Sequence, residues 1–331
     1  MSDRVGFLIF VGVSVRHVRN AATYWTAVCS VNAIVTTTAA NELDVIRLGG
    51  DLSVRRIGLG AMRMTGRGAW GPPRDRTEAL ATLRRAVDLG VNLIDTAESY
   101  GPHVSEQLIA ESLFPYPSDL VIATKGGYNR AGPDLWEIDC RPGRLKEELD
   151  GSLRRLRLDR IDLYQLHRID PDVPEDEQFG FLQRAQQEGK IRHIGLSEVS
   201  VPDIQRAQQF FAVASVQNRY NLVDRTWNSV VDFCERESIA FLPWSPLESV
   251  NRRHSLLGRC VQTARRLVGT RSAVAGVARR HSATPAQIAL AWLLRRATIV
   301  LPIPGTSARR HLEENAAAAH IRLSDEEFAS L

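Results

Sequence analysis

Val91-Asn92-Leu93-Ile94-Asp95-Thr96-Ala97-Glu98-Ser99-Tyr100-Gly101 is the stretch on which the interpretation of this 331-residue chain depends. Its first four residues form a short apolar run that is typical of a buried strand. Asp95 closes this run, and Tyr100 follows five residues later. A carboxylate at a strand end with a phenol on the next turn predicts a polar site at the carboxyl end of a sheet or barrel.

Two later apolar runs also end on ionisable side chains, which are Lys125 and His167. Because positive charge beside a phenol favours its ionised form, Lys125 is expected to lower the pKa of Tyr100, which is ordinarily about 10. Asp95 is the expected partner of Lys125, since a lysine that ends an apolar strand needs an anion. His167 is expected to act as a neutral donor to a substrate oxygen. The four side chains together predict a site that donates a proton to a carbonyl group.

Each of these side chains also has a purely structural explanation. Tyr100 could cap a helix at the surface, Lys125 could extend its amine to water, and His167 could satisfy a hydrogen bond in the core. Their place at the ends of successive strands favours the catalytic interpretation.

The chain from residue 57 onward alternates short apolar strands with amphipathic helices, which is typical of parallel α/β folds. Helices are predicted over residues 77–89, 144–156 and 284–294, the last with Thr284 as N-cap and Pro285 at the first helical position. No linker rich in Gly, Pro and Ser divides the chain. The predicted fold is an α/β (β/α)8 TIM barrel, with eight strands at Ile57–Met62, Val91–Asp95, Leu120–Lys125, Ile161–His167, Ile191–Ser197, Ala214–Asn218, Ile239–Trp244 and Thr298–Pro302.

The chain is divided into an N-terminal extension of residues 1–42 and a barrel domain of residues 43–331. The extension shows no strong hydrophobic period and is interpreted as a poorly anchored segment; an added strand, residues upstream of the natural start codon and a secretory signal around residues 6–13 are its alternatives. Residues 45–48 and 52–55 alternate in polarity around Gly49-Gly50-Asp51, which predicts a β-hairpin before the barrel.

Composition argues for a globular chain without nucleic-acid or membrane partners. The hydrophobic fraction is 44%, the charged fraction is 24% and the formal net charge is +4. No basic run of five residues and no apolar run of about 18 residues occurs. Cys29, Cys140, Cys234 and Cys260 are far apart and form no metal-ligand pattern, so we expect no metal site and reduced thiols in a cytoplasmic protein.

Seven motifs in order resemble the aldo-keto reductase superfamily, over almost the whole chain after residue 43. WGPPRDR at 70–76 and GLSEV at 195–199 are most similar to bacterial members near the pyridoxal reductases. The resemblance implies that the hairpin plugs the bottom of the barrel. It also implies that Tyr100 is the general acid. The seven motifs are DTAxxYG (95–101), TKGG (124–127), QLHR (165–168), GLS (195–197), QNRY (217–220), PWSPL (243–247) and IPGTS (303–307).

The resemblance further implies an NADP cofactor, because no side chain can donate a hydride. Trp244 would stack on the nicotinamide, and Arg309 with Arg310 would favour a 2′-phosphate. Three positions depart from the family, which often has asparagine, lysine and arginine where this chain has Glu198, Gly305 and His311. The implied cofactor-binding residues are Gly60, Ala61, Met62, Ser197, Glu198, Gln217, Trp244, Ser245, Pro246, Leu247, Ile303, Pro304, Gly305, Thr306, Ser307, Arg309, Arg310, His311, Glu314 and Asn315.

Trp70, Tyr128 and Trp136 are expected to form an apolar wall for a flat or aromatic substrate, although loop packing would also account for them. The function expected from the residues and the resemblance together is NADPH-dependent reduction of an aldehyde or ketone to an alcohol. Pyridoxal reduction is its nearest variant, and small aldehydes, quinones and keto sugars stay open. The alternatives are a non-catalytic NADP-binding redox-sensor subunit of the same fold and a barrel enzyme with unrelated chemistry. The oligomeric state is left open.

Overall fold

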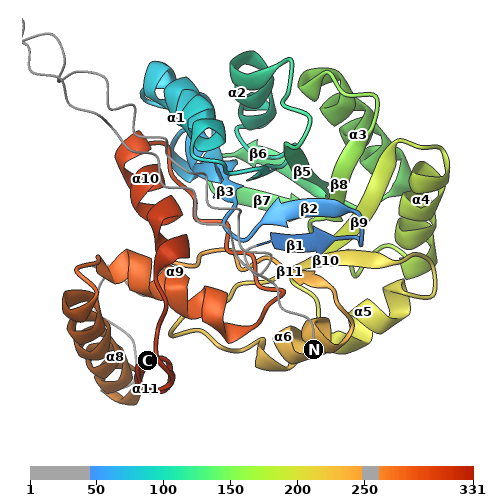
Figure 1. Ribbon diagram of the computed structural model, residues 1–331. Helices are drawn as coiled ribbons and strands as arrows, with labels where there is room; N and C mark the ends of the chain where they lie inside the picture. The colour runs from blue at the N-terminus through green and yellow to red at the C-terminus, as the bar shows by residue number, and fades with distance from the viewer. Residues whose placement is uncertain (1–44, 248–260) are drawn as a thin grey trace, which may run out of the picture. The chain divides into compact units, whose positions relative to one another are not determined.

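A computed structural model of the protein describes residues 45–247 and 261–331. Within them, a parallel sheet of seven strands has the order β11-β10-β9-β8-β5-β4-β3 (Figure 1). Each strand but one ends within two residues of its predicted end. The strands are β3 (Leu59–Gly60), β4 (Leu93–Asp95), β5 (Val121–Gly126), β8 (Ile161–Leu166), β9 (Ile191–Ser197), β10 (Val213–Gln217) and β11 (Ala240–Phe241).

The segment after residue 298 closes this sheet into a barrel, although it forms only isolated bridges. Val300 bridges to Phe241 of β11, and Gly305 bridges to Gly60 of β3. The N–H of Gly58 donates to the oxygen of Pro302 at 3.0 Å. Prolines 302 and 304 have no N–H to donate, so a continuous ladder cannot form there. The eighth strand predicted at Thr298–Pro302 therefore closes the barrel without being a regular strand.

The helices lie outside the strands, as the predicted barrel requires (Figure 1). Asp75 caps α1 by accepting from the N–H of Glu78, and a capping box of Thr284 and Gln287 begins α9 with Pro285 in its first turn. None of the helices among the described residues is long and apolar enough to cross a membrane. The helices are α1 (Arg76–Asp88), α2 (Val104–Leu113), α3 (Pro142–Leu156), α4 (Glu175–Gln187), α5 (Val201–Ala207), α6 (Asn228–Arg236), α8 (Val261–Arg280), α9 (Pro285–Arg296), α10 (Arg309–Ala317) and α11 (Asp325–Ser330).

The predicted hairpin comprises β1 (Val45–Leu48) and β2 (Leu52–Arg55), with Gly49 and Gly50 at φ of 62° and 88° in its turn. It lies at the amino ends of the barrel strands, because the Asn92 side chain just before β4 donates to the oxygen of Ser53 and accepts from the N–H of Arg55. Its buried side chains join the cluster that fills the barrel interior. That cluster includes Ile46, Leu48, Leu52, Val54, Leu93, Val121, Leu163, Ala214, Leu242, Leu301 and Ile303.

A second hairpin was not predicted and lies after β5, at the opposite end of the barrel. It comprises β6 (Tyr128–Gly132) and β7 (Leu135–Ile138) and carries two of the residues expected to contact substrate. Its outer strand is largely exposed. Asp95, Lys125 and His167 lie at the carboxyl ends of the barrel strands, which is the end where β6 and β7 lie. The first hairpin lies at the other end of the barrel. The extension expected at residues 1–42 lies outside the described residues.

Candidate active site

Asp95 and Lys125 form a buried ion pair at the carboxyl ends of adjacent strands. The Nζ of Lys125 lies 2.6 Å from Oδ2 of Asp95, and the two side chains are 0% and 3% exposed. The same Nζ donates to the oxygen of Thr96 at 2.9 Å. The other carboxylate oxygen, Oδ1, accepts from the amides of Gln165 and Gln217 at 2.9 and 2.8 Å. The pair is therefore desolvated but well satisfied by hydrogen bonds, as a stable buried pair requires.

Tyr100 packs directly against this ion pair. The Nζ of Lys125 lies 5.2 Å from the centre of the phenol ring. Burial raises the pKa of Tyr100 above its usual value, whereas Lys125 opposes that shift by its positive charge. The prediction that the net shift would be downward was wrong, because desolvation outweighs the nearby ammonium. The phenol consequently holds its proton at neutral pH, as a proton donor must.

His167 lies beside Tyr100, with ring centres 5.9 Å apart. Burial lowers its pKa well below the usual value, and the charges of Lys125, Arg168 and Arg130 lower it further. The imidazole is therefore neutral at physiological pH, as expected from the sequence. Its Nδ1 is buried without a hydrogen-bond partner among the described residues. A neutral imidazole has one N–H to donate and one nitrogen to accept, so this side chain can bind a further polar group.

Two of the three residues expected to contact substrate surround the catalytic rings. Tyr128 lies 4.7 Å from His167, and Trp136 lies 6.3 Å from both His167 and Tyr100, in each case between ring centres. Trp136 is 36% exposed, so its ring faces solvent as well as the site. Trp70 lies farther out and contacts the guanidinium of Arg130. Together these rings suit a flat substrate.

Several of the implied cofactor residues lie at the ends of β9, β10 and β11. Ser197 accepts from the guanidinium of Arg168 at 3.1 Å. Glu198 has a left-handed backbone, with φ of 56°, and one of its carboxylate oxygens accepts from the indole N–H of Trp244 at 2.6 Å. The same oxygen accepts from the backbone N–H of Arg219. Glu198 thus orients Trp244, and its implied role in cofactor binding stays a prediction.

A pocket of about 470 Å³ lies between the turn after β3 and the segment before α10. None of its lining residues is acidic, and three of them are basic. Gly305 allows the two walls to approach, because a Cβ there would lie 3.1 Å from the Cγ of Arg63. The lining residues are Met62, Arg63, Thr65, Gly66, Arg67, Gly68, Ala69, Gly305, Thr306, Ser307 and His311.

The remaining implied cofactor residues do not line this pocket, and some of them already have hydrogen-bond or ion-pair partners in the structure. The guanidinium and backbone N–H of Arg309 both bind Glu78, at 2.9 Å in each case. Arg310 is exposed and does not line the pocket. Glu314 accepts from the hydroxyl of Thr284 at 2.5 Å, and Asn315 is buried. Gly60, Ala61, Ile303 and Pro304 are buried at the barrel rim, and Ser245, Pro246 and Leu247 follow Trp244.

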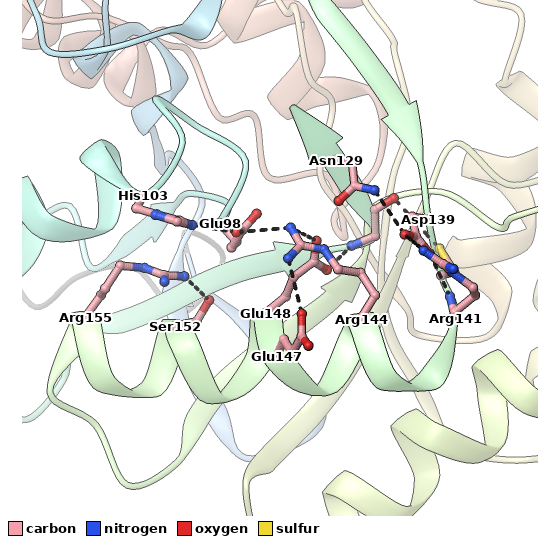
Figure 2. Close-up of polar contacts among 12 residues, drawn as sticks. Glu98, His103, Asn129, Asp139, Arg141, Arg144, Glu147, Glu148, Ser152 and Arg155 are labelled. Carbon is pink, nitrogen blue, oxygen red and sulfur yellow. Dashed lines mark hydrogen bonds and ion pairs between the residues drawn. The ribbon is translucent and has the colours of Figure 1, made fainter. Parts of the chain in front are cut away.

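A buried charged network behind the Tyr100 turn was missed by the sequence analysis (Figure 2). Nη2 of Arg144 lies 3.5 Å from Glu98, two residues before Tyr100, and 3.1 Å from Glu148. The other oxygen of Glu148 accepts from the backbone N–H of Gly127, two residues after Lys125, at 2.6 Å. A signal was present in the sequence, because Glu148 falls on the apolar stripe of α3 beside Leu149. The network therefore joins α3 to two of the three chain segments that carry the candidate catalytic side chains, namely the turn of Tyr100 and the end of β5.

Glu148 predicts a pH-dependent stability. Burial and then the charge of Glu98 raise its pKa from 4.5 to about 8. The folded state therefore holds this proton more tightly than the unfolded chain, so its stabilising contribution is complete below pH 4.5 and is lost as the pH rises to about 8. Between pH 5 and 8, Glu148→Gln is expected to gain stability relative to wild type, by up to about 5 kcal/mol.

Urea unfolding at several pH values measures this difference. Glu147→Gln is the matched control, since Glu147 is the preceding residue on α3 and its side chain is 75% exposed. A stability difference between Glu148→Gln and wild type that stays constant from pH 5 to 8 would show that Glu148 does not bind a proton in this range.

Solved structures share this fold over most of the chain. The glycerol dehydrogenase of Gluconobacter oxydans is 27% identical with a TM-score of 0.78, covering 88% of this chain and 94% of that one. An aldo-keto reductase of Klebsiella pneumoniae, solved in complex with NADPH, is 28% identical with a TM-score of 0.70 and covers 86% and 93%.

Curated relatives are more similar in sequence. An uncharacterized oxidoreductase of Schizosaccharomyces pombe is 46% identical over 299 residues, which are 89% of this chain and 92% of that protein. Pyridoxine 4-dehydrogenase of Escherichia coli is 38% identical over 288 residues, which are 85% and 95%. The sequence model of the Aldo/keto reductase family matches residues 56–331. This chain is therefore an oxidoreductase that belongs to the aldo/keto reductase family.

Proposed function

We propose that the protein, through residues 43–331, reduces an aldehyde or ketone to an alcohol with NADPH, and that Tyr100 donates the proton. The observation that carries this proposal is the contact between the protonated phenol of Tyr100 and the buried Lys125–Asp95 pair, beside the neutral ring of His167. This set of side chains can polarise a carbonyl and protonate its oxygen without a metal ion.

Each catalytic side chain has a separate task in this proposal. Tyr100 gives its proton to the carbonyl oxygen as that oxygen gains negative charge. Lys125 stabilises the phenolate that is left, because its ammonium favours the ionised form of the ring. Asp95 holds Lys125 in place and keeps it charged. His167 donates a hydrogen bond to the same carbonyl oxygen and orients the substrate.

The residues around the pocket fit a phosphorylated cofactor. The pocket has basic residues and no acidic ones in its lining, and no acidic side chain occupies the first turn of α10. Because the carboxylate of Glu78 already accepts from the backbone N–H of Arg309 at the start of α10, we assign the phosphates to the basic lining of the pocket and not to that helix N-terminus. NADPH bound there would supply the hydride that no side chain can provide. Gly305, Thr306, Ser307 and His311 would hold its phosphates, and Trp244, Gln217 and Ser197 lie at the strand ends where its ring is expected.

The preference for NADPH over NADH can be tested on α10. The double variant Arg309→Ala, Arg310→Ala is expected to weaken NADPH binding by at least about tenfold and NADH binding by less than about twofold, because only NADPH carries a 2′-phosphate. Titration calorimetry measures both dissociation constants. An equal loss for the two cofactors would mean that the 2′-phosphate binds elsewhere, for example at Arg63 or Arg67.

The proposed substrate class is a flat aldehyde or ketone, with pyridoxal first among the candidates. Tyr128 and Trp136 beside the catalytic rings support a planar substrate. The pyridoxine 4-dehydrogenase of Escherichia coli, at 38% identity, supports pyridoxal or its alcohol as the first compounds to try. We further propose a cytoplasmic location, since Cys140 and Cys234 are free, buried thiols.

Cofactor titration followed by substrate addition tests the proposed function. Tryptophan fluorescence should fall as NADPH binds near Trp244, and the reduced nicotinamide should then be oxidised when pyridoxal or another aldehyde is added. Tight NADPH binding without oxidation by any carbonyl in a broad panel would contradict catalysis. That outcome would favour the alternative of a redox-sensor subunit.

A further inference from the structure

All three guanidinium nitrogens of Arg130, on β6, donate hydrogen bonds to backbone oxygens around the mouth of the candidate active site. An arginine side chain has five N–H donors in a planar fork. Here Nε donates to Leu135 at 2.9 Å, Nη1 donates to Ser99 at 2.8 Å and Ala69 at 3.2 Å, and Nη2 donates to Gly68 at 2.8 Å and Gly132 at 3.3 Å.

These five oxygens belong to three chain segments that form the walls of the site. One segment is the β6–β7 hairpin, the second is the turn that carries Tyr100, and the third is the turn at Gly68 and Ala69. Backbone hydrogen bonds already link them in pairs, because Asp134 donates to Gly68 at 3.1 Å and Gly101 donates to Ala69 at 3.0 Å. Arg130 is the side chain that contacts all three segments at once.

The face of the same guanidinium lies against the aromatic wall. Its central carbon is 3.5 Å from the ring centre of Trp136 and 5.8 Å from that of Trp70. A guanidinium stacked on an indole is attracted by the negative face of the ring, and it is held more firmly where the contact is partly buried. Trp136 therefore contacts Arg130 at its ring face and also lies edge-on to Tyr100 and His167, 6.3 Å away between ring centres in each case.

Arg130 makes no ion pair with any residue in the ranges 45–247 and 261–331. The charges of Asp134 and Glu98 act on Arg130 without forming an ion pair, and the charge of Arg130 in turn contributes to the low pKa of His167. Lysine could supply the charge but not the planar fork, because its three donors come from a single nitrogen.

We propose that Arg130 is a positioning residue that fixes Trp136 and the Tyr100 turn at the spacing required by a flat carbonyl substrate, and that it thereby sets the preference of the enzyme for aromatic over small aldehydes. This inference rests on the proposed reductase function. Arg130 does not itself line the pocket before α10, and it reaches that pocket only through the backbone oxygens of Gly68 and Ala69.

Arg130→Met and Arg130→Lys test the proposal, with Arg236→Met as the matched control. Arg236 likewise lies over an aromatic ring, 5.8 Å from the centre of Phe233, but unlike the half-buried Arg130 it is exposed and lies on α6 in the outer layer. Both Arg130 variants are expected to lower kcat/KM for pyridoxal or benzaldehyde by at least about tenfold, mainly through KM. For propanal the expected loss is less than about twofold, and the loss of NADPH affinity measured by calorimetry should also stay below about twofold, because Arg130 touches the pocket only through the backbone of Gly68 and Ala69. Arg236→Met should match wild type throughout.

Two kinetic outcomes would overturn the proposal. Recovery of wild-type selectivity by Arg130→Lys would mean that the positive charge, and not the planar guanidinium group, determines the preference for aromatic aldehydes. Equal losses for benzaldehyde and propanal, together with weaker NADPH binding, would mean that Arg130 supports the fold in general and has no role in selectivity.

If the wild-type protein binds NADPH but reduces no carbonyl, the proposed function fails while the inference about Arg130 can still be tested. Acrylamide quenching of tryptophan fluorescence then serves as the measurement. Arg130→Met is expected to increase quenching relative to wild type and Arg236→Met, because Trp136 loses the group that covers one face of its ring. Unchanged quenching would overturn the positioning role.

Discussion

Tyr100→Phe is expected to lower kcat for carbonyl reduction by at least about a hundredfold, which is the usual scale for removing a positioned acid. The substitution removes only the hydroxyl, so the ring still packs against Lys125, His167 and Trp136. NADPH affinity is therefore expected to stay within about twofold of wild type. Initial rates with a saturating aldehyde and a calorimetric titration with NADPH measure the two quantities.

Tyr116→Phe is the matched control for Tyr100→Phe. Tyr116 also has a partly buried hydroxyl, which donates to the oxygen of Leu156 at 2.8 Å, but it packs against Phe114 at the surface. This control is expected to lose about 1 kcal/mol of stability and none of its turnover. Near-normal turnover in Tyr100→Phe would contradict the assignment of the proton donor.

Lys125→Met is expected to destabilise the protein by about 3–5 kcal/mol, because it leaves the carboxylate of Asp95 buried without a counter-charge. The ammonium is 0% exposed and is the only cation that the described residues place in an ion pair with Asp95. Urea unfolding monitored by circular dichroism measures the loss. The substitution should also lower turnover, since Lys125 no longer stabilises the ionised form of Tyr100.

The double variant Lys125→Met, Asp95→Asn distinguishes lost charge pairing from lost packing. Asparagine keeps the oxygen that accepts from Gln165 and Gln217 but carries no charge. Much of the stability lost in Lys125→Met should therefore return in the double variant, whereas turnover should not. If Lys125→Met were as stable as wild type, the description of a desolvated ion pair would be wrong.

The clustering of Asp95, Lys125 and His167 was predictable because parallel strands bring their carboxyl ends to one side. Asp95 and Lys125 each end an apolar run, and β4 pairs with β5 in a register that places Asp95 beside Ala123, two residues before Lys125. The eighth strand was less predictable. Its segment occupies a strand position in the barrel, but Pro302 and Pro304 lack the N–H donors that a regular ladder needs. The β6–β7 hairpin was missed because its strands are only five and four residues long and β6 has no regular alternation of apolar and polar side chains.

Other features depended on contacts that leave little trace in a sequence. The pairing of Arg309 with Glu78 joins residues 231 positions apart. Arg130 binds backbone oxygens, which every residue possesses, so no residue type in the sequence indicates its partners. The net direction of the Tyr100 pKa shift depends on how deeply the ring is buried, and spacing alone does not give that depth. Glu148, in contrast, could have been found as a charged residue on an apolar helix face.

Transfer of deuterium from cofactor to product is the direct test of carbonyl reduction by hydride transfer at this site. The protein would be incubated with pyridoxal and NADPH carrying deuterium at the transferable position of the nicotinamide, and the alcohol would be analysed by mass spectrometry and NMR. We predict one deuterium on the carbinol carbon of pyridoxine, with formation of the alcohol strongly reduced in Tyr100→Phe. An alcohol without deuterium, or one formed equally fast by Tyr100→Phe, would contradict carbonyl reduction at this site.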